Sequence, residues 1–290
     1  GSFDRPDLSP LFLLRFLPNT TAAAIARLLG IHGENLSIGT ACASSTQAIG
    51  EAFRRVRFGY AQVALAVGGD SRLHAGGLLA YKKANALVVR SPDPSTAMRP
   101  FDVSRRGFVP GEGGAALVLE DMDFAAQRGA PILGEVLGYG SSLDAGSLTD
   151  PDGEGHAAQL AVQNALSEAS LGPSFVELIA AHGTGTIKND QREAKLIESL
   201  FPHRPKVIAL KSWIGHLASA CGIAELAILL ASLERGFLPP VRSLETPCLQ
   251  SLNLLRAFHH GTSSARTLLE SFGFGGQNAA LVLHLGSKHA

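Results

Sequence analysis

The amino-acid sequence predicts a layered α/β protein made of two similar halves. Short apolar runs, typical of buried strands, alternate along the chain with helical patterns rich in small residues. Hydrophobic residues make up 46% of the 290 residues and charged residues only 17%, which indicates a large buried core rather than a disordered chain. A strand–turn–helix pattern occurs twice, and this repeat predicts the two halves.

The expected elements can be placed in order along the chain. Five apolar runs are interpreted as strands, at residues 63–69, 115–120, 176–183, 206–211 and 278–285. Five further segments carry helical patterns, at residues 22–29, 44–57, 156–169, 191–201 and 218–236. Because strands and helices alternate, we expect parallel sheets with helices on their faces.

The repeat relates residues 36–50, LSIGTACASSTQAIG, to residues 207–227, VIALKSWIGHLASACGIAELA. Both read as a strand, a sharp turn and a small-residue helix, with His216 near the place of Cys42. A glycine pair and an AALVL run follow each of them, in GEGGAALVLE and in FGGQNAALVLH. We therefore expect one half over residues 1–130 and a second over residues 131–290.

The first half is expected to be incomplete. Only 41 residues precede Cys42, whereas about 85 separate Pro131 from His216, enough for two further strand–helix units. A sheet without its opening strands exposes apolar edges, so we expect such edges here.

Bulk properties exclude several classes of protein. The formal net charge is zero, so nothing in the charge balance indicates nucleic-acid binding. A small basic patch that docks an acidic partner is still compatible with a net charge of zero. Three widely spaced cysteines without a CxxC argue for a reducing compartment and against disulfides or structural zinc. No apolar run reaches about 18 residues, which predicts no membrane span. The opening Gly1-Ser2 resembles an expression scar with no signal peptide behind it, and we expect a cytoplasmic protein.

Cys42 is the first candidate for chemistry. A lone cysteine in an apolar protein is often a buried structural thiol. Here, however, it lies between the strand-like LSIGT and a helix start. At such a position the helix dipole lowers the pKa of a thiol, and neighbouring N–H groups can hold an oxyanion.

Two histidines follow predicted strands. His182 precedes Gly-Thr-Gly-Thr, and His216 lies at the start of a second small-residue helix; a turn or capping role is the alternative for His182. Lys211 closes an apolar strand and is either an ordinary solvated lysine or a buried one that requires a partner, for which Glu193 is a candidate.

Glycines are concentrated in ESFGFGGQN, residues 270–278, where they allow close approach of a ligand. The loop has neither the lysine of a P-loop nor the spacing of a dinucleotide fingerprint. One thiol and two imidazoles, with no set of metal ligands, suit acyl transfer through a thioester.

Five motifs in order carry a family resemblance: TACASS, MRPFDVSRRGFVPGEGGAALVLE, AHGTGTIKND, KSWIGHLASACG and ESFGFGGQN. With them the chain resembles the elongating β-ketoacyl-[acyl carrier protein] synthases of fatty-acid and polyketide assembly, from about residue 15 to about residue 285. The resemblance implies the duplicated α-β-α-β-α layers of the thiolase fold. It also implies that roughly a hundred family residues, with the opening strands, precede the point that matches the start of this chain.

The family's chemistry can be carried over residue by residue. The resemblance implies that Cys42 accepts an acyl chain as a thioester from the phosphopantetheine of acyl carrier protein. His182 and His216 then bind malonyl thioester and stabilise the enolate that forms on loss of CO₂. Attack of this carbanion on the acyl-Cys42 thioester extends the chain by two carbons.

The resemblance also assigns supporting roles. The N–H groups of Cys42 and Phe274 form an oxyanion hole, and the Phe274 side chain acts as a gate. Lys211 and Glu193 form a buried pair that holds the histidines. The substrate-binding positions implied are Thr184, Thr186, Phe272, Gly275 and Gly276. Substrates arrive on acyl carrier protein, so no separate cofactor or metal is implied. The chain is expected to form a homodimer, or a heterodimer with a chain-length-factor homologue.

Some parts of the sequence depart from the family pattern. Residues 147–156, SLTDPDGEGH, and residues 256–266, RAFHHGTSSAR, match no motif, and Trp213 is expected to reshape the acyl pocket. The alternatives are a non-catalytic chain-length factor, a degradative thiolase, and a binding-only protein. A chain-length factor lacks the nucleophile, and a thiolase keeps a second cysteine in its C-terminal glycine loop, where this chain has none.

Overall fold

A computed structural model describes residues 11–15 and 17–286; the terminal Gly1-Ser2 lies outside them. The chain divides into two compact units, residues 1–39 and 40–290. This division reflects compactness and does not test the predicted halves, so their boundary at residue 130 stays a prediction.

The smaller unit contains the short 3₁₀ helix η1 (Phe12–Arg15) and helix α1 (Thr20–Leu29). The stretch LSIGT was expected to be a strand, and this prediction is wrong: residues 34–40 have no regular secondary structure. A strand requires a pairing partner, and in the described part of the chain none pairs with this stretch.

The larger unit is built on a six-stranded sheet with the order β3-β10-β9-β4-β5-β7. The strands are β3 (Gly134–Leu143), β4 (Leu178–Ala180), β5 (Lys206–Ile208), β7 (Asn253–Leu254), β9 (Ala265–Gly273) and β10 (Gln277–Leu285). Strands β9, β4, β5 and β7 are parallel, but β10 runs antiparallel to both of its neighbours. The expected all-parallel sheet is therefore wrong at this edge, because the short turn between β9 and β10 permits only an antiparallel pair.

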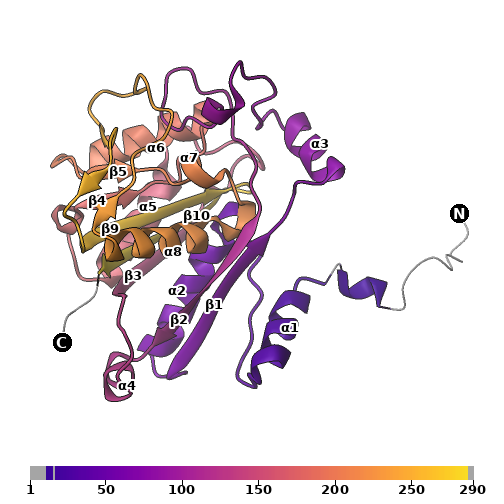
Figure 1. The fold of residues 1–290 in the computed structure, drawn as a ribbon, viewed down its shortest axis with the longest axis vertical. Helices are drawn as coiled ribbons and strands as arrows, with labels where there is room; N and C mark the ends of the chain where they lie inside the picture. Colours follow the sequence, from indigo (N-terminus) through magenta and orange to yellow (C-terminus); the bar gives the residue numbers. More distant parts are fainter. Residues whose placement is uncertain (1–10, 16, 287–290) are drawn as a thin grey trace, which may run out of the picture. The chain divides into compact units, whose positions relative to one another are not determined.

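Helices cover both faces of this sheet (Figure 1). On one face, α5 (His156–Glu168) and α6 (Ile187–Leu200) pack on strand residues such as Ile179 and Leu268. On the other face, α2 (Ser44–Arg57) and α8 (Cys221–Glu234) pack on the alternate residues, such as Leu269.

A second sheet lies on the far side of α2 and α8. It consists of β1 (Val63–Asp70) and β2 (Gly113–Glu120), an antiparallel pair whose Ala66 shares the apolar core of these two helices. The described residues of this unit thus form four successive layers, α, β, α and β.

Small residues let α2 and α8 approach closely at the centre of these layers. A Cβ atom added at Gly222 would lie 1.9 Å from Oγ1 of Thr46, so no larger residue fits there. The Ser45 hydroxyl also accepts a hydrogen bond from the N–H of Ile223, at 3.2 Å. The predicted role of the small residues, close packing of the helix that follows Cys42, agrees with these contacts.

The two turns that precede α2 and α8 have the same form. Each is a single 3₁₀ turn, η2 (Ala41–Ala43) and η5 (Ala218–Ala220), and each begins with an alanine of positive φ, 48° and 47°. Each helix then leads to an antiparallel pair, β1–β2 or β9–β10. When the two turns are aligned residue by residue, Ser219 of η5 corresponds to Cys42 of η2. His216 lies three residues before Ser219.

Most expected elements are present, with shifted ends. The expected strands 176–183 and 206–211 end at residues 180 and 208. After β4 the chain enters the loop of His182 that leads to α6, and after β5 it begins α7 (Lys211–Ile214). Sequence patterns did not indicate β3, β9 or the following elements: α3 (Ala75–Lys83), α4 (Met122–Gln127), β6 (Phe237–Leu238), β8 (His259–His260), η3 (Pro94–Thr96) and η4 (Pro173–Phe175).

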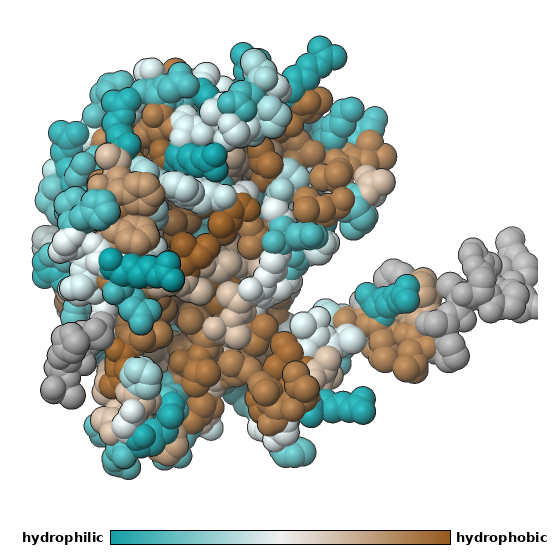
Figure 2. Space-filling view, in the orientation of Figure 1, coloured by the Kyte–Doolittle hydropathy of each residue, from teal (hydrophilic) through white to brown (hydrophobic). Residues whose placement is uncertain are grey.

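Apolar side chains lie uncovered on the β1–β2 sheet. Val63 and Val118 are 44% and 61% exposed, and Figure 2 shows apolar residues gathered over this part of the larger unit. None of the helices in the described ranges has the length and apolar character that a membrane span requires.

Candidate active site

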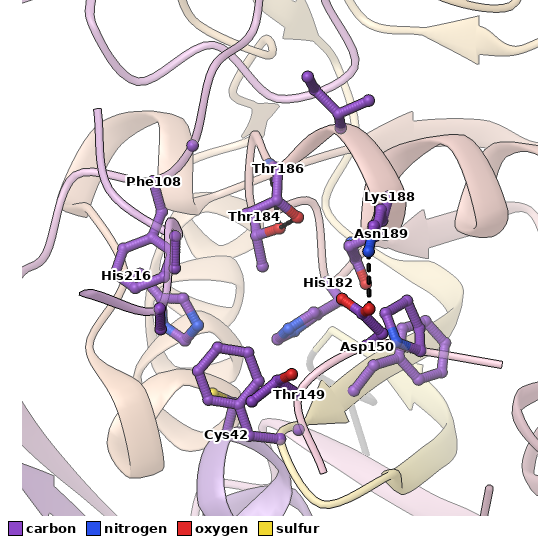
Figure 3. A pocket seen from close by; sticks show the side chains of 18 of the residues that line it. Cys42, Phe108, Thr149, Asp150, His182, Thr184, Thr186, Lys188, Asn189 and His216 are labelled. Carbon is purple, nitrogen blue, oxygen red and sulfur yellow. Dashed lines mark hydrogen bonds and ion pairs between the residues drawn. The ribbon is translucent and has the colours of Figure 1, made fainter. Parts of the chain in front are cut away.

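Cys42, His182 and His216 line one cavity of about 680 Å³ (Figure 3). Cys42 comes from the turn before α2, His182 from the end of β4, and His216 from the loop between α7 and η5. The carboxyl end of a parallel strand is where α/β sheets commonly build sites, and β4 follows that rule. The structure therefore brings together the three residues that the sequence singled out.

The Cys42 thiol is enclosed by the site although the residue as a whole is only partly buried. Burial raises its pKa to about 11, against the opposing effects of the Lys211 charge and the Phe274 N–H. The expected lowering of this pKa by the helix start is therefore wrong, because removal of the thiolate from water outweighs it. The resting residue is a neutral thiol.

The loop after β9 lies directly against the Cys42 turn. A Cβ atom at Gly273 would be 2.9 Å from the carbonyl oxygen of Thr40 and 3.0 Å from the backbone nitrogen of Cys42. The N–H of Phe274 consequently points at the Cys42 sulfur. The N–H of Phe274 and the N–H of Cys42 itself are therefore the backbone donors beside the thiol.

Some residues of this glycine loop line the cavity, and others form the turn behind it. Phe272, Phe274 and Gly276 line the cavity, and the ring of Phe272 is 5.7 Å from that of His182. Gly275 is not among the lining residues; it forms the turn, and its N–H donates to the carbonyl of Leu148 at 2.8 Å.

His182 is buried and neutral. Burial, followed by the nearby charge of Lys211, lowers its pKa well below the usual value. Nζ of Lys211 lies 3.3 Å from Nδ1 of His182, so the ammonium donates to that nitrogen. Because Nδ1 accepts, the imidazole proton resides on Nε2.

His216 also carries its proton on Nε2, but its Nδ1 has different hydrogen-bond partners from that of His182. Its Nδ1 accepts the N–H of Ala218 at 3.0 Å and lies 3.1 Å from Sγ of Cys221. Burial and the charge of Lys211 lower its pKa well below the usual value. The two imidazoles, with ring centroids 5.6 Å apart, thus both carry their proton on Nε2 and are hydrogen-bond donors there.

Lys211 forms a buried ion pair, but its partner is Glu225 and not Glu193 as expected. Nζ of Lys211 lies 2.7 Å from Oε1 of Glu225 on α8, and both side chains are almost completely buried. Burial acts to lower the pKa of Lys211, but the Glu225 carboxylate outweighs it and raises the pKa above its usual value. The chain turns into α7 at Lys211, and this turn directs the ammonium to α8 rather than to α6.

Glu193 holds the His182 backbone instead. Its carboxylate accepts the N–H groups of His182 and Gly183 at 2.6 and 2.9 Å, and the side-chain amide of Asn189 at 3.0 Å. Glu193 therefore does support a histidine, but through the main chain.

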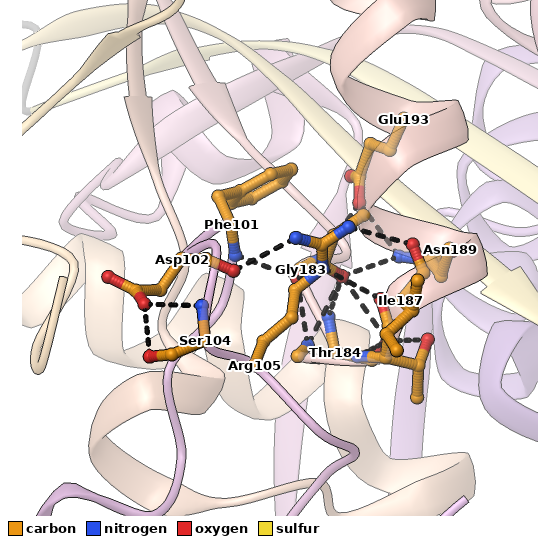
Figure 4. Close-up of polar contacts among 12 residues, drawn as sticks. Phe101, Asp102, Ser104, Arg105, Gly183, Thr184, Ile187, Asn189 and Glu193 are labelled. Atoms are coloured by element: carbon orange, nitrogen blue, oxygen red, sulfur yellow. Dashed lines mark hydrogen bonds and ion pairs between the residues drawn. The ribbon is translucent and has the colours of Figure 1, made fainter. Parts of the chain in front are cut away.

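The GTGT loop is organised by Asp190, which sequence reasoning missed. Its carboxylate accepts the N–H groups of Thr184 and Gly185 at 3.0 and 3.1 Å, and that of Phe101 at 2.7 Å (Figure 4). Its position on the first turn of α6, three residues before Glu193, is the signal that was available in NDQREAK. Thr184 and Thr186 line the cavity and share a hydrogen bond of 2.8 Å.

Two of the unassigned sequence features receive a place. Thr149 and Asp150, from the unmatched segment 147–156, line the cavity, and Asp150 pairs with Lys188 at 2.7 Å (Figure 3). Trp213 is not among the residues that line this cavity, and its expected effect on the acyl pocket stays a prediction. It is 41% exposed, and its indole N–H donates to the carbonyl of Pro240 at 2.8 Å.

Comparisons with known proteins show the family to which the chain belongs. Residues 4–125 match the model of the β-ketoacyl synthase N-terminal domain, and residues 133–245 match that of the C-terminal domain. A 3-oxoacyl-[acyl-carrier-protein] synthase 2 of Synechocystis is 36% identical over 277 residues, covering 94% of this chain and 67% of the relative. A mitochondrial synthase of Arabidopsis thaliana is 34% identical over 286 residues, covering 95% of this chain and 61% of the relative.

Solved structures show the same fold. A β-ketoacyl synthase from Burkholderia phymatum has a TM-score of 0.91 and 30% identity, covering 98% of this chain and 69% of the other. A type II polyketide ketosynthase, solved with its acyl carrier protein, has a TM-score of 0.90 and 28% identity over 97% of this chain and 70% of the other. The chain thus spans about two thirds of the length of its relatives. The predicted thiolase-like layered fold is confirmed, and the chain belongs to the β-ketoacyl synthase family.

Proposed function

We propose that this chain is the catalytic part of a β-ketoacyl-[acyl carrier protein] synthase that condenses an acyl chain with a malonyl unit. The observation that carries the proposal is one cavity in which the Cys42 thiol lies with two neutral imidazoles, both donors at Nε2. His182 and His216 are proposed as catalytic donors, and Lys211 and Glu193 as the residues that keep His182 in place.

The first step is thioester exchange. The acyl carbon forms a bond to the Cys42 sulfur while its bond to the pantetheine sulfur breaks, and the thiol proton leaves with pantetheine. Because the pKa of Cys42 is about 11, the proton is removed as the new bond forms rather than beforehand. The N–H groups of Cys42 and Phe274 stabilise the oxyanion of the tetrahedral intermediate.

The second step is decarboxylation of the malonyl thioester. The bond to the carboxylate breaks, CO₂ leaves, and the electron pair develops as an enolate whose oxygen faces Nε2–H of His182 and His216. Neutral donors fixed in a buried site stabilise such a charge, and removal of one typically costs about 10²–10³ in rate. The Lys211 ammonium behind His182 keeps the required tautomer.

The third step is condensation. The enolate carbon attacks the acyl carbonyl, the bond to the Cys42 sulfur breaks, and the released thiolate takes up a proton. The product is a β-ketoacyl thioester two carbons longer. Thr184, Thr186 and Phe272 are proposed to contact the malonyl and pantetheine groups, with Gly275 and Gly276 shaping the turn beside them.

Acyl carrier protein is the proposed partner, in fatty-acid or polyketide biosynthesis, with phosphopantetheine as part of the substrate. The exposed cations Lys83, Arg106 and Lys188 line the cavity and suit the phosphate of that arm. A homodimer or a heterodimer with a chain-length factor is proposed by analogy with solved ketosynthase complexes. The expected cytoplasmic location stays a prediction.

A non-catalytic chain-length-factor role is the second candidate, because two similar structures are ketosynthases with their chain length factors. The complete set of Cys42, His182 and His216 in one cavity favours the catalytic role. No cysteine lies in residues 270–278, which argues against the degradative thiolase.

The test is intact-protein mass spectrometry after incubation with acyl carrier proteins of several chain lengths. We expect one acyl group per chain on the wild type and on the Cys248→Ala control, and none on Cys42→Ala. Retained acylation of Cys42→Ala contradicts the catalytic role, and the chain length that loads best identifies the substrate.

A further inference from the structure

Glu270 is a buried carboxyl group for which the mechanism above has no use. It lies in β9, and its side chain is completely buried. Within the described ranges, neither of its oxygens accepts an N–H or O–H group. A charged carboxylate in this position would carry a large desolvation cost without compensation.

The group that faces Glu270 is a second carboxyl, that of Glu193 on α6, which lies within hydrogen-bonding reach. Strand alternation supports this placement, because Leu268 and Phe272, on the same side of β9 as Glu270, belong to the core that includes α6. Two ionised carboxylates repel at this separation, and a hydrogen bond between them exists only if one carries a proton.

The distribution of donors decides which of the two is protonated. Burial and then the Asp190 charge raise the pKa of Glu193 to about 7, but the N–H groups of His182 and Gly183 oppose this rise. With the amide of Asn189, Glu193 accepts three N–H groups that favour its anionic form over that of Glu270. Glu270 has no such donor among the described residues. The proton therefore belongs to Glu270, which can then donate to Glu193.

Among the described residues no cation forms an ion pair with Glu270, although the charge of Arg192 acts to lower its pKa. Arg192, on α6, lies 3.6 Å from the carboxylate of Asp144 and stacks over Phe272 at 4.6 Å. Lys211 is paired with Glu225. The charged groups that act directly on Glu270 are Glu193 and Arg192, both on α6. The elements in contact with β9 also carry His284 on β10, Glu225 and Glu234 on α8, and Cys42 in η2.

We propose that Glu270 is held as a neutral acid whose proton is shared with Glu193, and that this carboxyl pair positions His182. The pKa of Glu270 is raised well above its usual value by burial and then by the Glu193 charge, in agreement with the geometry. Glu270 touches no substrate and acts through Glu193 on the backbone of His182. The positioning role of Glu270 rests on the proposed function, because it requires His182 to be catalytic. The shared proton itself does not depend on that function.

The pair makes folding stability depend on pH in a defined direction. Above pH 4.5, the ordinary value for glutamate, Glu270 releases its proton in the unfolded chain but keeps it in the folded one. The folded state then binds one more proton, so the unfolding constant rises about tenfold per pH unit until the pair ionises. Glu270→Gln keeps a donor towards Glu193 but cannot titrate, so the Glu270 component disappears, while Glu193, with a pKa raised to about 7 by burial, still contributes its own.

Denaturant unfolding at several pH values between 5 and 8 tests the proposal without reference to activity. We expect the ratio of the wild-type unfolding constant to that of Glu270→Gln to rise by up to tenfold per pH unit. Glu198→Gln, an exposed change on α6, serves as the control and keeps the wild-type dependence. Parallel curves for the wild type and Glu270→Gln overturn the proposal.

Malonyl decarboxylation supplies the functional readout. Glu270→Leu, which removes the donor, is expected to lower kcat at least tenfold, and Glu270→Gln to recover most of that loss. Equal losses in the two variants overturn the positioning role, and the unfolding experiment remains decisive if the leucine variant does not fold. A wild-type protein that neither loads acyl groups nor decarboxylates refutes the proposed function but leaves the carboxyl pair standing.

Discussion

Replacement of Lys211 by methionine tests how the buried ion pair supports the histidines. The change removes the ammonium 2.7 Å from Glu225 and leaves that carboxylate buried without its partner. Loss of one member of a buried pair typically costs about 3–5 kcal/mol of unfolding free energy. It also removes the donor 3.3 Å from Nδ1 of His182, so the imidazole proton is free to occupy Nδ1 and the Nε2–H donor is lost.

The double variant Lys211→Met/Glu225→Leu separates these two effects. Replacing both charges with apolar groups of similar size is often neutral for stability, so we expect the double variant to unfold within about 1–2 kcal/mol of the wild type. Its decarboxylation rate is still expected to fall about 10²–10³-fold, the typical effect of a lost transition-state donor.

The assays are denaturant unfolding monitored by circular dichroism and CO₂ release from malonyl carrier protein. The exposed Lys195→Met on α6 is the matched control and is expected to change neither quantity. A double variant that decarboxylates at the wild-type rate refutes the idea that Lys211 sets the tautomer of His182. A single variant as stable as the wild type refutes the buried pair.

Three further predictions follow from the site. The rate of Cys42 alkylation by iodoacetamide, followed by mass spectrometry, should rise about tenfold per pH unit from pH 7 towards the pKa of about 11, because only the thiolate reacts. A rate that reaches a plateau below pH 9 contradicts the raised pKa. Buried Cys221 should be labelled later than Cys42. Cys42→Gln should no longer accept an acyl group but should still release CO₂ from malonyl carrier protein. His216→Ala should accept the acyl group normally, and its rate of CO₂ release should fall about 10²–10³-fold. Normal condensation by His216→Ala would show the enolate role to be wrong. Gly273→Ala should cost about 1–3 kcal/mol and reduce acyl loading, because its Cβ meets backbone at 2.9–3.0 Å; an unchanged loading rate and melting temperature argue against this close approach.

Local sequence was sufficient for much of the site. Cys42, His182 and His216 each follow a recognisable apolar run or precede a small-residue helix, and such patterns depend only on near neighbours in the chain. The repeat around AALVL also predicted a duplication, because two copies of one unit keep the same order of local signals. The family resemblance rests on the same short motifs.

Tertiary structure decided what depends on contacts between distant segments. Lys211 pairs with Glu225 rather than Glu193, and Trp213 lies on the surface, because the turn at α7 sets the direction of both side chains. The pKa of Cys42 rises because residues brought in from β9 and elsewhere remove the thiol from water, an effect that no local pattern records. Sequence patterns report the periodicity of one segment, whereas burial and ion pairing are properties of several segments packed together.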